Sequence, residues 1–231
     1  MNTVFEPAAA VTVPVVGQTA SFPVHRIYCV GRNYEAHAKE MGGTGREAPF
    51  FFMKPADAVL VVQSGTTTVM PYPTLTNNLH HEVELVVAIG VGGAHIKAAD
   101  AARHIFGYAV GLDMTRRDLQ ADLKNQGRPW CIAKGFDHSA PIGAITPAAQ
   151  VPGIADAAIT LQVNSEVRRT GVTNQMIWNI AETIEQISIA WSLQAGDLIY
   201  TGTPEGVGTV VHGDVMVGTI DGLQSISVRV E

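Results

Sequence analysis

Two carboxylates, Glu82 and Glu84, stand one residue apart in the segment 79–90, near the start of an apolar run. The run is rich in β-branched and aliphatic residues, which indicates a buried strand, and side chains at i and i+2 of a strand lie on one face. Two carboxylates side by side in a buried strand repel each other and lose their hydration unless a cation or a shared proton compensates them. We therefore expect a metal ion to bind at Glu82 and Glu84.

A third carboxylate, Asp113, ends a second predicted strand over residues 108–113. It lies where this strand passes into a predicted helix with Thr115 as N-cap, and such junctions often carry site residues. With the other two carboxylates it offers only oxygen ligands, which favours Mg²⁺ or Mn²⁺. His80 and His81 raise the alternative of zinc, but adjacent strand residues point to opposite faces, so at most one could join the carboxylates.

A possible base is His37, which lies three residues before Glu40 in a short helix predicted over residues 34–41. This spacing puts the imidazole and the carboxylate on one helix face, where Glu40 could orient and polarise His37. A solvated surface pair is the alternative, because such pairs are common and contribute little stability. Lys134 also has two interpretations, since a lysine in the apolar stretch 130–137 either serves the site or extends to the surface.

The elements that must position these side chains are mostly strands. The pattern predicts strands at 26–31 and 197–201, a turn at 54–55, a helix at 98–106, a hairpin of 159–163 and 166–169, a helix at 175–192, and a final hairpin turning at 221–222. Strands do not alternate regularly with helices, so a Rossmann or barrel fold is not favoured.

The glycine-rich stretch 201–208 lacks the Gly-Lys-Ser/Thr of a P-loop and the Gly-x-Gly-x-x-Gly order of a dinucleotide-binding turn. It is better interpreted as a loop whose backbone closely approaches a small ligand, with Thr203 available to form a hydrogen bond.

Composition limits the class of protein. The chain has 231 residues, is 46% hydrophobic and 16% charged, and carries a formal net charge of −6. These values favour a single core and exclude a surface for nucleic acid or an anionic membrane. Cys29 and Cys131 do not make a disulfide framework, and neither a signal peptide nor an apolar run long enough to span a membrane is found, so we expect a cytoplasmic protein. Residues 1–24 are interpreted as an N-terminal arm that packs on one catalytic domain, 25–231.

Several sequence blocks occur together and in order along the chain. They are 28–34, 37–41, 52–55, 78–85, 111–115, 133–137 and 201–208. Taken together they resemble the fumarylacetoacetate hydrolase family from about residue 25 to the C-terminus. Within that family the chain resembles the small acylpyruvases, and its N-terminal arm and residues 49–52 resemble the bacterial fumarylpyruvate hydrolases of gentisate breakdown.

This resemblance implies an α+β, mostly β fold, a mixed β-roll with flanking helices, and usually a homodimer. It implies Mg²⁺ or Mn²⁺ held by Glu82, Glu84 and Asp113. It also implies roles for seven further residues: catalysis by His37, Glu40 and Lys134, and substrate binding by Arg32, Arg117, Gln120 and Thr203.

The implied activity is hydrolysis of the C–C bond of acylpyruvates, which are 2,4-diketo acids, and above all of fumarylpyruvate to fumarate and pyruvate. In that reaction His37, with Glu40, would activate the water that attacks C4. The alternatives are an oxaloacetate decarboxylase, an isomerase of the same family, or a non-catalytic protein that binds a metal ion or ligand. His37 and Glu40 favour hydrolysis because decarboxylation needs no activated water.

Overall fold

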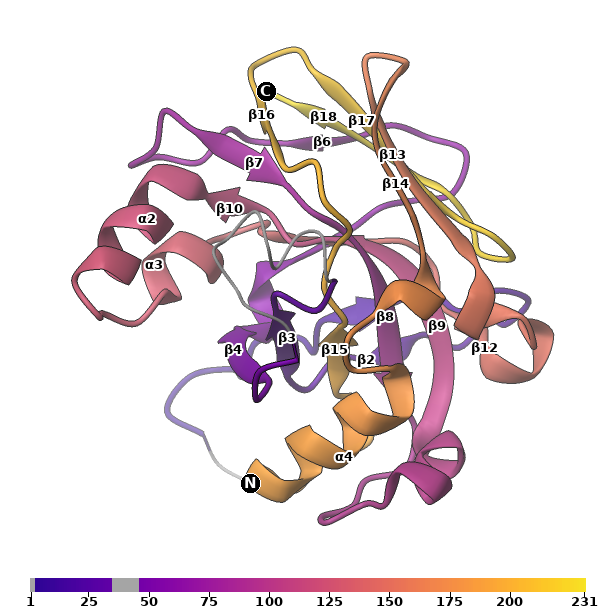
Figure 1. Ribbon diagram of the computed structural model, residues 1–231. Helices are drawn as coiled ribbons and strands as arrows, with labels where there is room; N and C mark the ends of the chain where they lie inside the picture. The colour runs from indigo at the N-terminus through magenta and orange to yellow at the C-terminus, as the bar shows by residue number, and fades with distance from the viewer. Residues whose placement is uncertain (1–2, 35–45) are drawn as a thin grey trace.

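The computed structural model describes residues 3–34 and 46–231. Most elements in this part of the chain are strands, and Figure 1 labels the main ones. The strands are β1 (Thr12–Val13), β2 (Phe22–Pro23), β3 (Ile27–Gly31), β4 (Phe50–Lys54), β5 (Val59–Val61), β6 (Thr68–Met70), β7 (Leu79–His81), β8 (Val83–Ile89), β9 (Ile105–Leu112), β10 (Thr115–Arg116), β11 (Ala140–Ile142), β12 (Thr146–Pro147), β13 (Ala158–Val163), β14 (Glu166–Val172), β15 (Leu198–Tyr200), β16 (Gly208–Val210), β17 (Val215–Ile220) and β18 (Ile226–Val230). The α-helices are α2 (Arg117–Asn125), α3 (Cys131–Lys134) and α4 (Ile180–Ala190), and the 3₁₀ helices are η1 (Ala56–Ala58), η2 (Ala98–His104), η3 (Ala148–Gln150), η4 (Ile154–Asp156) and η5 (Thr173–Gln175).

Most strands form two sheets that share one apolar core. The larger sheet has the order β4-β3-β15-β8-β9-β11-β5, with β12 beside β9, and it mixes parallel and antiparallel pairs. The smaller sheet has the order β14-β13-β17-β18-β6 and stands at the upper right of Figure 1, whereas α4 lies below and α2 and α3 lie at the left. The helices therefore flank the sheets at separate places.

Strand β8 separates two apolar clusters because its side chains alternate between the faces of the larger sheet. Leu85 and Val87 enter the larger cluster, which includes buried residues of the smaller sheet and of α4. Val86 and Ala88 enter a second cluster, which includes residues of the N-terminal strands and β15. Burial on both faces explains why the strand is an almost continuous apolar run, in which Glu84 is the exception.

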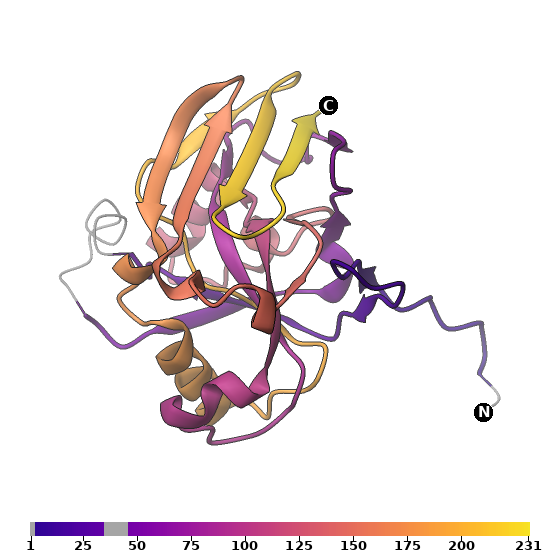
Figure 2. The same cartoon turned by 90° about the vertical axis from the view of Figure 1, so that its right-hand side faces the viewer.

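The N-terminal segment lies against the larger sheet over part of its length. Strands β1 and β2 pair antiparallel, and Val13, Val15 and Phe22 are buried in the second cluster. Residues 3–10 are exposed and extend away from the body in Figure 2. The packed part of this segment therefore begins close to β1.

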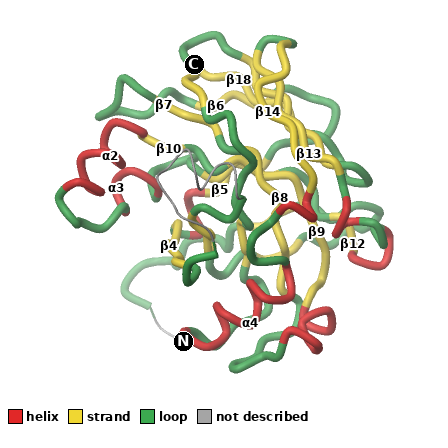
Figure 3. Tube along the Cα trace, viewed as in Figure 1, coloured by secondary structure: helices red, strands yellow, loops and turns green. Residues whose placement is uncertain are grey.

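The mostly β fold class with flanking helices is confirmed, and the sheets curl into a mixed half-barrel. Figure 3 shows more strand than helix along the trace, with loops between these elements. The hairpin predicted at 159–163 and 166–169 is confirmed as β13 and β14, with Asn164 and Ser165 at positive φ in its turn. Among the described residues, no helix is long and apolar enough to cross a membrane.

The helix predicted over residues 175–192 is shorter in the structure and begins at Ile180. The Asn179 side chain accepts a hydrogen bond from the Glu182 backbone N–H (3.0 Å), and the Glu182 carboxylate accepts one from the Asn179 N–H (3.1 Å). This capping box fixes the start of α4. Met176, which falls inside the predicted range, lies in an isolated β-bridge before the helix.

The helix predicted over residues 98–106 is the 3₁₀ helix η2, which ends at His104. It stops there because Ile105 already pairs with Ile89 at the end of the β8–β9 ladder. Strand pairing with a buried neighbour thus replaces the last turn of the predicted helix.

Thr115 was predicted as a helix N-cap, and this prediction is wrong. Thr115 lies in β10 opposite His80, its hydroxyl donates to the Asp113 carbonyl oxygen (3.2 Å), and α2 begins at Arg117. Apart from Tyr34, the helix predicted over residues 34–41 lies outside the described residues.

Candidate active site

The pairing of β8 with β9 brings the three predicted carboxylates together. Glu84 pairs with Gly111, and the backbone N–H of Asp113 donates to the Glu82 carbonyl oxygen at 2.8 Å. Glu82, Glu84 and Asp113 are all buried, and each offers one carboxylate oxygen within 4.8 Å of the other two. The predicted cluster therefore forms, at the end of the β8–β9 ladder.

Three cationic side chains contact two of these carboxylates. Lys134 Nζ lies 2.8 Å from Glu82 Oε2 and 2.7 Å from Asp113 Oδ2, so it bridges the two acids. Lys54 Nζ lies 2.8 Å from Asp113 Oδ1, and Arg117 forms an ion pair with Glu82. Burial would lower the pKa of Lys134, but the carboxylates of Asp113 and Glu82 outweigh it and raise that pKa above its ordinary value. Lys134 therefore keeps its charge in this buried position.

Glu84 is held differently. Its Oε2 accepts a hydrogen bond from the backbone N–H of Gly202 at 2.8 Å. Burial and then the charges of Asp113 and Glu82 raise the pKa of Glu84 well above its ordinary value. Gly202 has φ +94°, and a Cβ there would lie 2.8 Å from the Asn33 Cβ, so the loop needs glycine to bring this N–H to Glu84.

The donor set fits a hard divalent cation. All donors are carboxylate oxygens, which suit Mg²⁺ or Mn²⁺, and a cation beside Glu84 would offset the repulsion that raises its pKa. His80 and His81 are not members of this cluster, and His80 Nε2 instead lies 2.9 Å from Asn78 Oδ1. The zinc alternative therefore has no histidine ligand in the cluster that the described residues form.

Lys54 is a site residue that the sequence interpretation missed, because it was assigned to a turn. It ends β4, its side chain is buried, and its Nζ donates to the carbonyl oxygens of Met114 (3.2 Å) and Lys134. The alternation of Phe50, Phe52 and Lys54 along the strand was the available signal, since it places a charged side chain on an otherwise aromatic face.

A cavity opens onto the carboxylates and collects the predicted substrate residues. Its wall includes Glu82, Glu84, Arg32, Arg117, Gln120, Lys134 and Thr203. Every predicted site residue in the described part of the chain thus lies in this cavity or in the carboxylate cluster. His37 and Glu40 lie outside the described residues.

Neighbouring side chains fix the orientation of these polar groups. The Gln120 side-chain oxygen accepts a hydrogen bond from Arg117, so the two act as a unit. Thr203 accepts a hydrogen bond from Arg169, a buried residue of β14 that also donates to the Pro204 carbonyl oxygen. Arg169 was not predicted, because a strand pattern alone gives no sign that this arginine turns inward.

Aromatic side chains form the rest of the cavity wall and were also missed as site residues. Phe50, Phe52 and Trp130 line it together with Val30 and Gly31. The cavity therefore has a charged inner end at the carboxylates and an aromatic outer end.

Comparisons with known proteins agree with this geometry. The family profile described as Fumarylacetoacetate (FAA) hydrolase C-terminal matches residues 26–231. A solved structure of fumarylpyruvate hydrolase from Pseudomonas aeruginosa, in complex with Mn²⁺ and pyruvate, is 54% identical, covers 99% of each chain and has a TM-score of 0.97.

Two curated relatives have other activities in their names. Oxaloacetate tautomerase FAHD1 of Arabidopsis thaliana is 43% identical over 206 residues, which are 89% of this chain and 91% of that protein. The mitochondrial oxaloacetate decarboxylase of Dictyostelium discoideum is 38% identical over 200 residues, 87% of this chain and 90% of that one. The names of these relatives thus refer to two different 2-oxo acids, fumarylpyruvate and oxaloacetate.

Proposed function

The chain belongs to the fumarylacetoacetate hydrolase family, a family of enzymes, and on this premise we propose that it is a metal-dependent hydrolase of acylpyruvates with fumarylpyruvate as its main substrate. The observation that carries the proposal is the cavity, which joins a carboxylate cluster suited to Mg²⁺ or Mn²⁺ to a basic and aromatic wall. Whole-length similarity to a fumarylpyruvate hydrolase supports the choice of substrate.

The charge of the site favours a substrate with two negative charges. The three carboxylates of the cluster, with a charge of −3, face the cations of Lys54, Lys134 and Arg117, with a charge of +3, so these six groups balance. A divalent cation held by the three carboxylates would supply a Lewis acid to stabilise negative charge on the substrate oxygens. These six groups and the cation would then carry two excess positive charges, and Arg32 on the cavity wall adds a third, so the site would attract a substrate with two carboxylates such as fumarylpyruvate.

The hydrolysis itself requires a water molecule, a base and a place for the leaving group. Water adds to the C4 carbonyl, the C3–C4 bond breaks, and C3 takes up a proton, so one fumarate and one pyruvate are formed. In this proposal His37, polarised by Glu40, removes the proton from water, as the sequence motif suggests. Lys134 and Gln120 line the cavity beside the carboxylates, where they can donate hydrogen bonds to the substrate.

A second candidate function is isomerisation or decarboxylation of oxaloacetate. Relatives at 43% and 38% identity have oxaloacetate tautomerase and oxaloacetate decarboxylase in their names. Oxaloacetate is also a 2-oxo acid with two carboxylates, so the same charges would bind it. It lacks the acyl group that the aromatic outer end of the cavity could contact.

A substrate panel tests the choice. Fumarylpyruvate, acetylpyruvate and oxaloacetate are each incubated with the protein and Mg²⁺ or Mn²⁺, and products are followed by NMR. We expect fumarate and pyruvate from fumarylpyruvate at a higher kcat/KM than any conversion of oxaloacetate. Conversion of oxaloacetate with both diketo acids left intact would show that the second candidate is correct.

A further inference from the structure

One face of β4 lines the cavity through Phe50 and Phe52. Phe50, Phe52 and Lys54 alternate on this face, and β4 pairs with β3 so that Phe50 lies opposite Gly31 and Phe52 opposite Cys29. Lys54 reaches Asp113 at the inner end, so the two rings lie progressively farther outward along the same strand.

The short helix α3 lies beside β4 and repeats this arrangement. The Lys134 backbone N–H donates to the Trp130 carbonyl oxygen at 2.9 Å, so the two residues are one helical turn apart and share a face. The Trp130 ring contacts Phe50 and Phe52 with centroid distances of 5.5 and 5.9 Å, and both contacts are edge-to-face. Lys134 Nζ lies 5.0 Å from the Phe52 centroid. β4 and the segment of α3 therefore each have a lysine at the inner end and at least one aromatic ring farther out.

Arg32 follows β3 and adds a positive charge where the rings end. Its guanidinium carbon lies 5.0 Å from the Phe50 ring centroid, and Arg32 lines the cavity together with Phe50 and Trp130. Gly31 makes this packing possible, because a Cβ at Gly31 would lie 2.0 Å from Phe50 Cζ. The Phe50 ring thus occupies the space that any other residue at position 31 would need.

We propose that Phe50, Phe52 and Trp130 form an acyl subsite, and that Arg32 binds a carboxylate at the far end of the acyl group. The inference rests on the proposed function and specifies its substrate class as acylpyruvates whose acyl group is flat, unsaturated and ends in a carboxylate. Ring edges and faces favour a flat conjugated chain, and arginine forms charge-assisted hydrogen bonds with a carboxylate. A short acyl group such as acetyl reaches neither Arg32 nor the outer rings.

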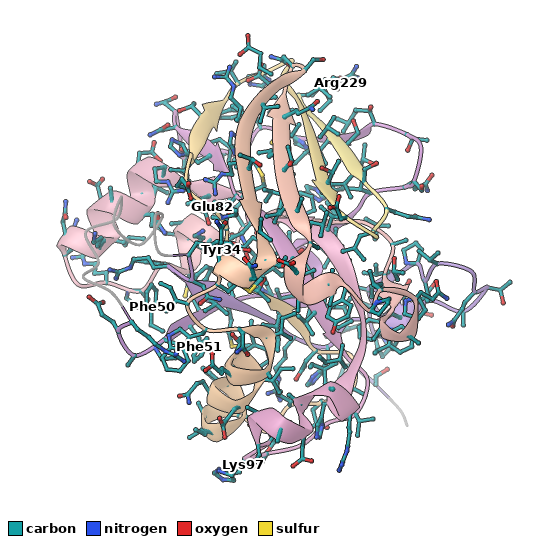
Figure 4. The ribbon with its side chains drawn as sticks, turned by 45° about the vertical axis from the view of Figure 1, so that its right-hand side comes forward. Tyr34, Phe50, Phe51, Glu82, Lys97 and Arg229 are labelled. Carbon is teal, nitrogen blue, oxygen red and sulfur yellow. The ribbon has the colours of Figure 1, made fainter. Side chains whose placement is uncertain are left out.

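The test compares two substrates in matched variants. Arg32→Gln should lower kcat/KM for fumarylpyruvate by roughly 10- to 100-fold, the usual effect of losing a hydrogen bond to a charged group, and change acetylpyruvate by less than about 3-fold. Arg32→Lys should recover part of the loss. The control Arg229→Gln should behave as wild type with both substrates, since Arg229 is an exposed residue of β18 far from Glu82 in Figure 4.

Gly31→Ala tests the position of the Phe50 ring without changing Arg32. The added methyl group should displace the Phe50 ring and lower kcat/KM for fumarylpyruvate about 10-fold, again with little effect on acetylpyruvate. Equal losses for both substrates in Arg32→Gln and Gly31→Ala, or no loss for either substrate, would overturn the proposal.

A binding experiment separates failure of the subsite from failure of the proposed function. If the wild type cleaves neither acylpyruvate, the proposed function is wrong, and the subsite is then judged by calorimetry. Protein saturated with Mg²⁺ and oxalate is titrated with fumarate, and weaker fumarate binding in Arg32→Gln than in wild type and Arg229→Gln supports the subsite. Equal fumarate binding in all three proteins refutes it.

Discussion

The two ends of the cavity are built in different ways. At the inner end, the backbone ladder between β8 and β9 fixes Glu84 and Asp113, and ion pairs with buried lysines hold the carboxylate oxygens. At the outer end, Phe50 stands on the edge strand β4, which among the described strands pairs only with β3, and Trp130 precedes a helix of four residues, and the two rings pack edge-to-face. We therefore expect a change at an inner residue to disturb both chemistry and stability, and a change at an outer residue mainly to alter which substrate fits.

Replacing a carboxylate of the inner end should have the largest effect. Glu84→Gln keeps the shape and the hydrogen bond from Gly202 but removes the charge, so we expect activity to fall to background. The rise in melting temperature on adding Mg²⁺ or Mn²⁺ should disappear as well, because only a ligand that binds the folded state raises its stability. Thermal melts with and without metal measure this, with Asp100→Asn as control. Full activity and an unchanged metal-dependent shift in Glu84→Gln would mean that the metal site is elsewhere.

His37→Ala should slow the chemical step without weakening the binding of metal or oxalate at the inner end of the cavity. We expect kcat to fall by roughly 10²–10⁴, the usual contribution of a general base, while affinity for Mg²⁺ and oxalate stays near that of the wild type. Adding Glu40→Gln to His37→Ala should cause little further loss, because residues that act as a unit are not additive. Steady-state kinetics and calorimetry measure both. A parallel loss of metal or oxalate binding would assign His37 to ligand binding instead.

Lys54→Met should reduce stability more than any change at the outer end. Lys54 is buried against Asp113, and removing one partner of a buried ion pair costs about 3–5 kcal/mol of the free energy of unfolding. Urea denaturation measures this, and the double variant Lys54→Met, Asp113→Asn should lose less than the sum of the single variants. Lys97→Met is the control, because the Lys97 side chain is 75% exposed and lies far from Glu82 in Figure 4. Equal stability of Lys54→Met and Lys97→Met would show that the inner end does not depend on this pair.

A substitution on the face of β4 that points away from the cavity should have the smallest effect on activity. Phe51 packs edge-to-face on Trp191 with centroids 6.2 Å apart, and it alternates with the cavity residues Phe50 and Phe52. Phe51→Leu should therefore cost about 1 kcal/mol of stability and leave kcat/KM for fumarylpyruvate within 2-fold. Phe50→Leu should cost about as much stability, because Phe50 packs edge-to-face on Trp130, but it should also lower kcat/KM for fumarylpyruvate. If Phe51→Leu alters the preference between fumarylpyruvate and acetylpyruvate, the two faces of the strand are wrongly assigned.

Features that depend on neighbours in the chain could be predicted from the sequence. The spacing of Glu82 and Glu84 predicts that their side chains lie close together, and the position of Asp113 at the end of the following strand predicts that it joins them. The capping box of Asn179 and Glu182 is also a local pattern, and it marks the start of α4 at a later residue than the predicted start at 175.

Features that depend on distant partners could not be predicted in this way. Lys54 is a site residue only because β3 and β4 bring it to Asp113, and Arg169 is buried only because the loop with Thr203 and Pro204 accepts its hydrogen bonds. In the sequence, nothing distinguishes Phe50 from the other apolar residues of its segment. Its role becomes visible only in the pairing of β4 with β3, which places its ring against Gly31. In each case the deciding contact joins segments that no local pattern connects.

The position of β15 affects the order in which the protein can fold during synthesis. This strand, Leu198–Tyr200, lies between β3 and β8 in the larger sheet, so strands that a ribosome makes early are joined by one that it makes late. Until β15 is made, β3 and β8 each lack their shared neighbour, and their unpaired edges are open to other chains. The loop after β15 also carries Gly202, which binds Glu84. The hydrogen bond that holds the Glu84 carboxylate therefore forms only after most of the chain has been made, although Glu82, Glu84 and Asp113 all come from its first half.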